Sequence, residues 1–505
     1  MKTVFPMKIS VLACLFAACL LRLSAATYYF DYGSFHTAGV DMNLSETQSY
    51  WFADSSFSTP VENLDFLTSG GDNIAFVKPA STTANRVTLV FDMDVRVAGL
   101  DDASIAYSYF RMEPGKTFAV EGDAVLGNWS SAFYGASGGG GALSIQGNLT
   151  MTQSYALGNI NNPLESLYVG GLTTLRTGTG EFVLCASGNG SHGIDEPDAI
   201  FAGGLTINVA QQRSVLLGAF NPDLAVNARS CVWVNGVNGY VGFSMGGNSS
   251  SSGVFNVVFT NLTNASSAGN LSMVNSAGTG RMNIVMRSSS SGGDGAYAYL
   301  NRTQSFTGDD MGFKGDVSCI SGTLKLNYNA TGADLAGRGN LILSRASGAE
   351  TAAFGNSSDT VGGAFAFSSI EVSDGGGSII VRLDSSDGSA VSYDCLSLEN
   401  SVSGSGTVVI DLRNFNGNSP DEFIDIMIEN DIALKVISWA SAAEGGVEFV
   451  AADGYGVYNY GGRDYFFTAN NAADGLYISY QIPEPAGWAA IFGVVAAAVA
   501  IRRRR

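Results

Sequence analysis

Short runs in which apolar and polar residues alternate recur along the chain, and most of them begin at a glycine. In one run, Gly141 is followed by apolar Leu143 and Ile145 at every second position. Alternation with a period of two predicts a strand with one buried face, and runs of roughly 3–6 residues fit short strands. We expect the leading glycine to supply the positive φ that a tight turn requires. The runs cover residues 141–145, 171–175, 204–207, 269–273, 322–326, 339–343, 377–381 and 406–410.

These strands are too short to form stable sheets one by one, so they predict a repetitive, all-β fold. Stacked as rungs of a solenoid, each strand would bury its inward side chains against the rungs above and below. The spacing between runs varies from about 17 to more than 60 residues. We therefore expect a degenerate repeat with insertions, and we assign it to residues 115–414.

Aromatic residues are more frequent on both flanks of the repeat region. Residues 27–114 predict an N-terminal β segment that caps the solenoid. Residues 415–481 contain strand patterns separated by Asp-Gly and Gly-Gly turns, such as Asp474-Gly475, which are typical of antiparallel hairpins. They predict a C-terminal β cap. Within this cap, residues 421–429 fit either a strand or a short helix.

The clearest repeat lies between residues 306 and 343. It begins with Phe306-Thr307-Gly308, continues through a strand pattern and the run at 322–326, and ends with the run at 339–343. This order resembles the autotransporter-associated β-strand repeat, closely over about 300–345 and loosely elsewhere between about 115 and 415. The resemblance implies a right-handed parallel β-helix.

The N-terminus has the three parts of a secretory signal. Lys2 and Lys8 form a basic region, residues 9–21 form an apolar run, and Ser24-Ala25-Ala26 supplies small residues for cleavage before Thr27. We therefore expect residues 1–26 to be a signal peptide, with Ser24 and Ala26 as the small residues that signal peptidase reads. The secretion machinery would then export the rest of the chain.

The last 24 residues, 482–505, combine a short motif, an apolar segment and a basic end. The motif is Pro483-Glu484-Pro485, the apolar segment covers residues 486–501, and the basic end is Arg502, Arg503, Arg504 and Arg505. Sixteen helical residues would be about 24 Å long, a little shorter than the ~30 Å core of a bilayer. The arginines favour a cytoplasmic position for this end. From the residues alone, the tail could be an ordinary membrane anchor in which the triplet arose by chance.

The tail resembles the PEP-CTERM sorting signal. In that family the triplet is read by a membrane enzyme called exosortase, the apolar helix holds it at the membrane, and the arginines stop transfer. The resemblance implies an inner-membrane intermediate in a diderm bacterium, followed by delivery to the cell surface or extracellular matrix.

Composition excludes several classes of protein. Glycine accounts for 64 of 505 residues without a collagen period, and 46% of residues are hydrophobic, which is too many for a disordered linker. Without the signal and the tail, 19 basic and 44 acidic residues remain, a net charge of about −25. Such a body repels nucleic acid. We expect no nucleic-acid partner and no cofactor.

Residues with catalytic or metal-binding chemistry are few and scattered. Of two histidines, His36 lies in the aromatic flank and His192 in an acidic loop, and we expect neither to be catalytic. Gly135-Ala136-Ser137-Gly138-Gly139 matches the nucleophile-elbow pattern, but that motif needs a following helix and a histidine partner. Asp309-Asp310 and residues 384–388 could bind Ca²⁺ weakly, although solvated turns are favoured.

The cysteines of the exported part also lack a recognised pattern. Cys185, Cys231, Cys319 and Cys395 are widely spaced. This spacing favours single buried thiols in strands over a disulfide framework or a zinc site. Disulfides stay possible after export, and the sequence does not assign a pairing.

We therefore expect a non-enzymatic structural or adhesive protein of the cell surface or extracellular matrix. Its partners would be the sorting enzyme and, through polar faces, an envelope or extracellular polysaccharide. The alternative is a β-helical polysaccharide lyase or hydrolase, which would need clustered carboxylates in a groove. An autotransporter passenger is disfavoured, because no series of amphipathic barrel strands follows the body.

Overall fold

The computed structural model describes most of the chain from Ala25 to Gln481, and the chain forms two compact units, Met1–Asn283 and Ile284–Arg505. The stretches outside the description are 1–24, 78–86, 103–108, 128–130, 137–139, 153–154, 159–161, 163, 177–181, 185–193, 196, 209–214, 218–228, 236, 245–253, 261–269, 275–280, 288–295, 301–314, 329–338, 350, 357–360, 363, 385–390, 415–420, 442, 453–457, 461 and 482–505.

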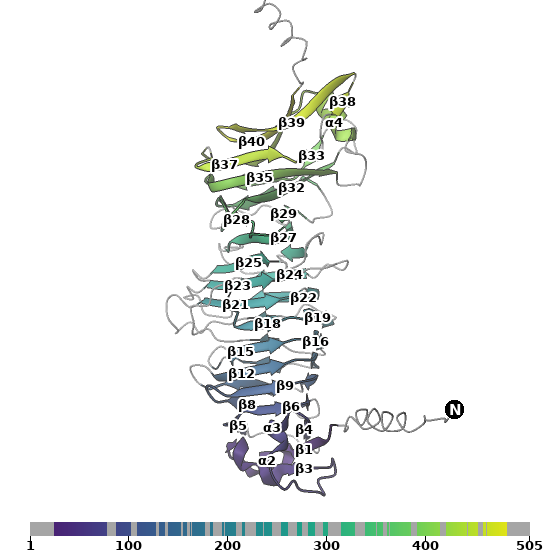
Figure 1. Cartoon of the computed structure of the whole chain (residues 1–505), viewed down its shortest axis with the longest axis vertical. Helices are drawn as coiled ribbons and strands as arrows, with labels where there is room; N and C mark the ends of the chain where they lie inside the picture. The colour runs from purple at the N-terminus through teal and green to yellow at the C-terminus, as the bar shows by residue number, and fades with distance from the viewer. Residues whose placement is uncertain are drawn as a thin grey trace, which may run out of the picture. The chain divides into compact units, whose positions relative to one another are not determined.

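Strands dominate the described residues, which confirms the all-β prediction. In the first unit they fall into three sets, and nearly every strand pairs in parallel with the strand three places further along the chain. The chain therefore visits three sheets in turn and returns to the first, which stacks successive coils within this unit (Figure 1).

The first set is β4 (Asn73–Val77), β7 (Gly99–Asp101), β10 (Ala124–Leu126), β13 (Leu149–Met151), β16 (Thr173–Arg176), β19 (Leu205–Asn208), β22 (Val237–Ser244) and β24 (Asn270–Val274). The second is β5 (Thr88–Phe91), β8 (Tyr109–Met112), β11 (Ser131–Gly135), β14 (Tyr155–Leu157), β17 (Phe182–Leu184) and β20 (Val215–Leu217). The third is β6 (Val95–Val97), β9 (Thr117–Val120), β12 (Gly140–Ile145), β15 (Leu164–Val169), β18 (Ala199–Phe201), β21 (Arg229–Val234) and β23 (Val254–Phe259).

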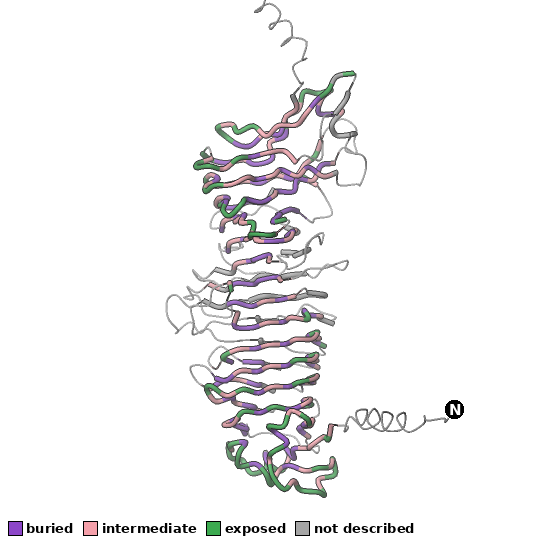
Figure 2. The backbone as a smooth tube through the Cα atoms, in the orientation of Figure 1, coloured by how far each residue is buried: buried purple, intermediate pink, exposed green. Residues whose placement is uncertain are grey.

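Inward side chains of paired strands stack into continuous apolar rows. In the first set Leu126, Met151 and Leu175 follow one another in register and are fully buried. Figure 2 shows buried and partly exposed segments following one another along the strands whose burial is described. Because each row is closely packed, truncating one of these side chains to alanine costs roughly 2–5 kcal/mol.

In the second unit, long strands belong to two sheets at once. The 12-residue β27 (Val317–Tyr328) pairs with one set of neighbours through Val317–Cys319 and with another after Gly322, where φ is +79°. The run predicted at 322–326 is therefore the second half of a longer bent strand. Parallel pairings through β27 and β35 (Val402–Asn414) form a closed circuit. Its other members are β28 (Leu341–Ser344), β29 (Ala352–Asn356), β31 (Ile370–Ser373) and β32 (Gly377–Asp384), and β25 (Arg281–Arg287), β26 (Ala296–Leu300) and β37 (Gly446–Ala451) pair onto it.

A further sheet of the second unit contains the expected antiparallel hairpins. Its order is β30 (Ala364–Phe367), β34 (Cys395–Leu398), β36 (Leu434–Ser438), β40 (Gly475–Gln481), β39 (Arg463–Ala472) and β38 (Tyr458–Tyr460). Strands β36, β40, β39 and β38 are antiparallel, with the predicted Asp474-Gly475 turn between β39 and β40. The short β33 (Ser392–Tyr393) pairs with β32. The segment Asp421–Glu429, which the sequence left open, is a helix, α4.

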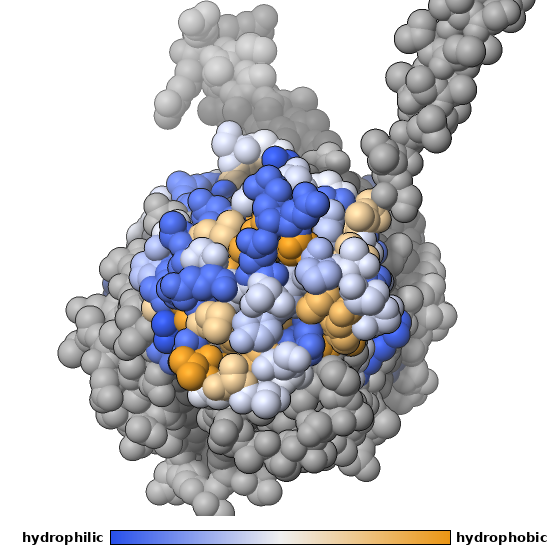
Figure 3. Space-filling view, turned by 90° about the horizontal axis from the view of Figure 1, so that it is seen from below, coloured by the Kyte–Doolittle hydropathy of each residue, from blue (hydrophilic) through white to orange (hydrophobic). Residues whose placement is uncertain are grey.

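The N-terminal flank forms an aromatic cap at the start of the first unit. It consists of β1 (Thr27–Asp31), α2 (Tyr32–Ala38), β2 (Met42–Asn43), two 3-10 turns (Leu44–Glu46 and Gln48–Tyr50), β3 (Trp51–Phe52) and α3 (Phe66–Ser69). The buried ring of Phe30 lies 4.9 Å from Trp51 and 5.4 Å from Phe76 between centroids. Seen from this end, the surface is mostly hydrophilic with small apolar spots (Figure 3).

The helices of this cap depart from the expectation of strands alone. Asp31 accepts hydrogen bonds from the backbone nitrogen of Ser34 at 2.9 Å and from its hydroxyl at 2.5 Å, which stabilises the start of α2. The hydroxyl of Tyr32 donates to the carbonyl of Val87 at 3.0 Å, and burial raises its pKa above the usual range. Parallel pairing with the following coils also begins inside this segment, since β1 pairs with β4.

Glycines at one corner of the coils allow successive turns of backbone to touch. The backbone nitrogen of Gly147 donates to the carbonyl of Gly122 at 2.9 Å, and that of Gly171 donates to Gly147 at 2.9 Å. A Cβ on Gly171 would lie 2.6 Å from the backbone of Gly147, and a Cβ on Gly203 would clash with the backbone of Gly171.

The prediction that the leading glycines have positive φ is therefore only partly correct. Gly204, Gly322 and Gly406 have positive φ, whereas Gly171 and Gly339 do not. At the latter two, the backbone of the previous coil occupies the place of a side chain, so close approach is the reason for glycine.

We predict that Gly171→Ala destabilises the folded protein by at least about 1–3 kcal/mol, because a methyl group there forces neighbouring coils apart. The control is Gly71→Ala, whose Cβ would meet only the Ser69 hydroxyl at 3.8 Å. Urea unfolding of residues 27–481, followed by circular dichroism, measures both variants. Equal stability of the two variants would show that the corner does not need glycine.

Candidate functional site at the C-terminal sheet

Most residues of the predicted sorting and cleavage sites lie outside the described part of the chain. These are Ser24, Pro483, Glu484, Pro485 and the four terminal arginines. Ala26 is described: it is exposed, and its carbonyl accepts a hydrogen bond from the backbone nitrogen of Asn73 at 2.7 Å. The predicted cleavage point therefore lies directly before β1, the first strand of the body.

The structure describes the sheet that directly precedes the predicted tail in the sequence. Strand β40 ends at Gln481 and is paired along both edges, with β36 on one side and β39 on the other. Gln481 itself is in register with Phe466 of β39. One residue, Ile482, separates the end of this sheet from Pro483.

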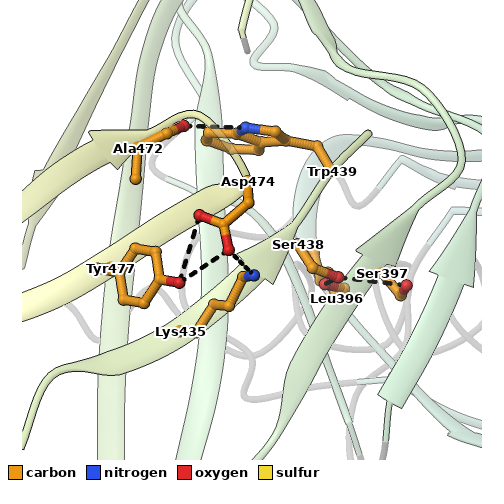
Figure 4. A network of polar contacts seen from close by, with 8 residues as sticks. All are labelled: Leu396, Ser397, Lys435, Ser438, Trp439, Ala472, Asp474 and Tyr477. Carbon is orange, nitrogen blue, oxygen red and sulfur yellow. Dashed lines mark hydrogen bonds and ion pairs between the residues drawn. The ribbon is translucent and has the colours of Figure 1, made fainter. Parts of the chain in front are cut away.

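A polar network holds the turn at the other end of β40 (Figure 4). The Lys435 ammonium lies 2.5 Å from a carboxylate oxygen of Asp474, and the Tyr477 hydroxyl donates to the same oxygen at 3.1 Å. The Lys435 nitrogen also lies 5.5 Å from the centre of the Tyr477 ring, within cation–π range. These contacts join β36, the turn and β40.

Electrostatics in this network favour the charged form of both partners. The hydrogen bond from Lys435 lowers the pKa of Asp474, and the hydrogen bond to Asp474 raises the pKa of Lys435. Lys435 therefore stays protonated in its contact with Asp474, and a protonated amine is unsuited to act as a nucleophile or base. The Asp474 side chain is 62% exposed, so solvent screens the pair and its net contribution to stability is small.

Neighbouring contacts extend this polar network across the sheet. The indole nitrogen of Trp439 donates to the carbonyl of Ala472 at 3.2 Å, and the Ser438 hydroxyl lies 3.3 Å from that of Ser397 on β34 (Figure 4). A Cβ at Gly475 would clash with the carbonyl of Ile437, so the turn requires glycine. The sequence showed the turn and both strands, but only their register brings Lys435 opposite Tyr477.

A buried ion pair in the second unit was also missed. Arg382 lies 2.7 Å from the carboxylate of Asp394, which also accepts a hydrogen bond from the Asn356 amide at 3.0 Å. Asp394 and Asn356 are buried, and the Arg382 side chain is 11% exposed. Breaking such a pair leaves a buried charge without compensation. Nothing in the local sequence pattern joins these three positions, which come from separate parts of the chain.

The other candidate residues do not come together. His36 lies in α2, whereas His192 and Asp309-Asp310 lie outside the described residues. Gly135 ends β11 and the next described strand, β12, begins at Gly140, so two strands flank the Gly-x-Ser-x-Gly pattern. Asp384 is the last residue of β32. In the described residues, no three His, Cys, Asp or Glu side chains lie close enough to hold a metal ion.

Two cysteines match the expectation of single thiols in strands. Cys231 and Cys319 are buried in β21 and β27, and burial raises the pKa of Cys319 to about 12. Cys395 is free and half-buried, and burial likewise raises its pKa. Cys185 lies outside the described residues.

No helix among the residues that the structure places is long and apolar enough to cross a membrane. The predicted helix at 486–501 lies outside them. Comparison with known proteins found no matching family model, no matching curated protein and no matching solved structure.

We predict a pH-dependent contribution of the Lys435–Asp474 pair to stability. Because the pKa of Asp474 is lowered on folding, its contribution is present above the unfolded value of about 3.9 and is lost as the pH falls through the folded value. Because the pKa of Lys435 is raised, its contribution is present below about 10.4 and is lost as the pH rises through the folded value.

The difference in melting temperature between wild type and Asp474→Asn should therefore be small but measurable near pH 7 and should vanish in acid. An NMR titration of the Asp474 carboxyl supplies the direct measurement. In Lys435→Met its pKa should return toward the usual value. An unchanged pKa in that variant would show that the pair does not form in solution.

Proposed function

We propose that this chain is an exported structural or adhesive protein, sorted through its C-terminal tail to the cell surface or extracellular matrix of a diderm bacterium. The observation that carries the proposal is the tail itself. A proline-flanked acid, an apolar segment of membrane-compatible length and a terminal arginine block occur there in the order of a PEP-CTERM signal. The exported body would be held in the inner membrane by this tail until an exosortase-type enzyme processes it.

We further propose that the body is a right-handed parallel β-helix. The parallel pairing of strands three places apart in the first unit supports this interpretation. Connections between parallel strands of one sheet are right-handed in almost all proteins, because of the twist of L-amino-acid strands. The resemblance to autotransporter-associated repeats points to the same architecture.

A non-enzymatic role at a polymer surface is supported by the outward side chains. Thr150, Thr174 and Thr206 occupy one in-register column on β13, β16 and β19 and are partly exposed. Neighbouring strands are about 4.8 Å apart, so the column repeats hydroxyl groups at a constant pitch. Among the described residues only Val40 and Leu172 are large apolar side chains with high exposure. We propose that such polar faces contact envelope or extracellular polysaccharide through hydrogen bonds.

The sorting proposal predicts that replacing Pro483, Glu484 and Pro485 with alanine leaves an intact protein in the inner membrane, because the processing enzyme has lost its recognition element. Membrane fractionation and immunoblotting of the full chain measure this result. The matched control replaces Glu113 and Pro114, an acid–proline pair in the body, and should be processed normally. If the triplet variant were processed like wild type, the tail would be an anchor alone.

The arginine block should determine how firmly the tail is held. Each arginine costs about 2.5–3.5 kcal/mol to place at the bilayer centre, so four of them prevent passage through the membrane. Replacing Arg502–Arg505 with alanine should release unprocessed protein from the membrane even with an intact triplet. Replacing them with lysine keeps the charge and should preserve anchoring. Equal anchoring of both variants would contradict the assigned role of charge.

A further inference from the structure

The folded C-terminal sheet lies unusually close to the sorting triplet. Gln481 is the last residue of β40, and Pro483 follows it by two positions. A polypeptide spans at most about 3.6 Å per residue. The start of the triplet therefore lies no more than about 7 Å from the end of a folded strand, whatever conformation the tail adopts.

Strand β40 is firmly held in this sheet. It is flanked by β36 and β39, and its register with β39 continues from Gly475 to Gln481. Next to its end, the hydroxyl of Tyr480 donates to the carboxylate of Asp431 at 2.9 Å, which ties β40 to the segment after α4. The Lys435–Asp474 contact fixes the opposite end. Releasing β40 would break pairing on both of its edges.

Recognition of the triplet needs room that this arrangement restricts. Enzymes and adaptors that read an extended peptide commonly bind its backbone as an added strand. Two of the three triplet residues are prolines without a backbone N–H, so the triplet offers one backbone donor, that of Glu484, and further backbone donors must come from flanking residues. On the upstream side, the flanking residues before Ile482 belong to β40 and already pair with β39. An enzyme that encloses Pro483 must also come into contact with the end of the β39–β40 hairpin.

We propose that the folded C-terminal sheet is a steric gate, which limits the rate at which the sorting enzyme reaches the triplet. This inference rests on the proposed sorting of the tail. The gate is set by two features. Strand β40 pairs with β36 as far as Ile478 and with β39 as far as Gln481, and a single residue lies between the sheet and the motif.

A flexible spacer tests this inference in the full-length chain, produced in a diderm host that carries the sorting enzyme. A Gly-Ser segment inserted between Gln481 and Ile482 moves the triplet away from the sheet without altering either. Pulse-chase labelling should then show a several-fold faster conversion of the membrane-bound precursor. A shorter insertion should give an intermediate rate. The same segment inserted after Gly348, at an open turn of the body, should leave the rate unchanged.

The outcomes separate the gate from the sorting proposal on which it depends. If the spacer leaves the rate unchanged or slows it while the alanine triplet still blocks processing, the gate is wrong and sorting stands. A slower rate would mean that the enzyme gains affinity from the folded sheet. If a spacer variant with an alanine triplet is processed like the spacer variant alone, the sorting proposal itself fails. Circular dichroism of each purified variant should show unchanged strand content.

Discussion

Close approach of backbone to backbone between successive coils is the constraint on which the first unit depends. A parallel pair with a spacing of about 4.8 Å leaves no room for a side chain where the chain turns a corner directly above another corner. Gly122, Gly147, Gly171 and Gly203 occupy such positions, and hydrogen bonds join the first three in sequence. With this corner in place, strands on either side fall into register and their inward rows, such as Leu126 over Met151, can pack.

Stacking of parallel strands leaves an unpaired strand edge where the stack ends. The two units cover this edge in different ways. At the start of the first unit, the two-residue β3 pairs antiparallel with β1, and the aromatic rings around Phe30 fill the interior. Short edge strands of this type discourage pairing with other molecules. In the second unit, the pairs β36–β40, β40–β39 and β39–β38 are antiparallel. In both units, antiparallel pairing replaces the parallel pairing of the repeat at that point.

Sequence reasoning identified the features that depend on local pattern and missed those that depend on register. Gly-led runs such as 141–145 and 406–410 lie in β12 and β35, and the Asp474-Gly475 turn joins two antiparallel strands. Alternation and turn residues are local signals, so single segments reveal them. The Lys435–Tyr477 and Arg382–Asp394 contacts were not predicted, because each requires knowing which residue of one strand faces which residue of another. The helix at α2 was missed because its residues, including Gly33 and Thr37, have low helix propensity.

Under the proposed sorting of the tail, the C-terminal sheet has a role that the stacked coils do not have. A coil in the middle of the stack needs only to match its neighbours, so its polar surface can vary without affecting the fold. Strand β40 pairs with two neighbours in the sheet, and one residue, Ile482, separates it from the predicted sorting triplet. In the proposed gate, stability of the sheet opposes access to the triplet, since the contacts that fix β40 also keep its last residues away from the sorting enzyme. The Lys435–Asp474 ion pair is exposed, and Tyr480 contacts Asp431 through one hydrogen bond. Strand β40 is therefore held mainly by backbone pairing and by the buried side chains of Leu476 and Ile478. A spacer leaves those contacts intact, so in the proposed gate it is spacing, rather than stability, that separates folding of the sheet from processing of the tail.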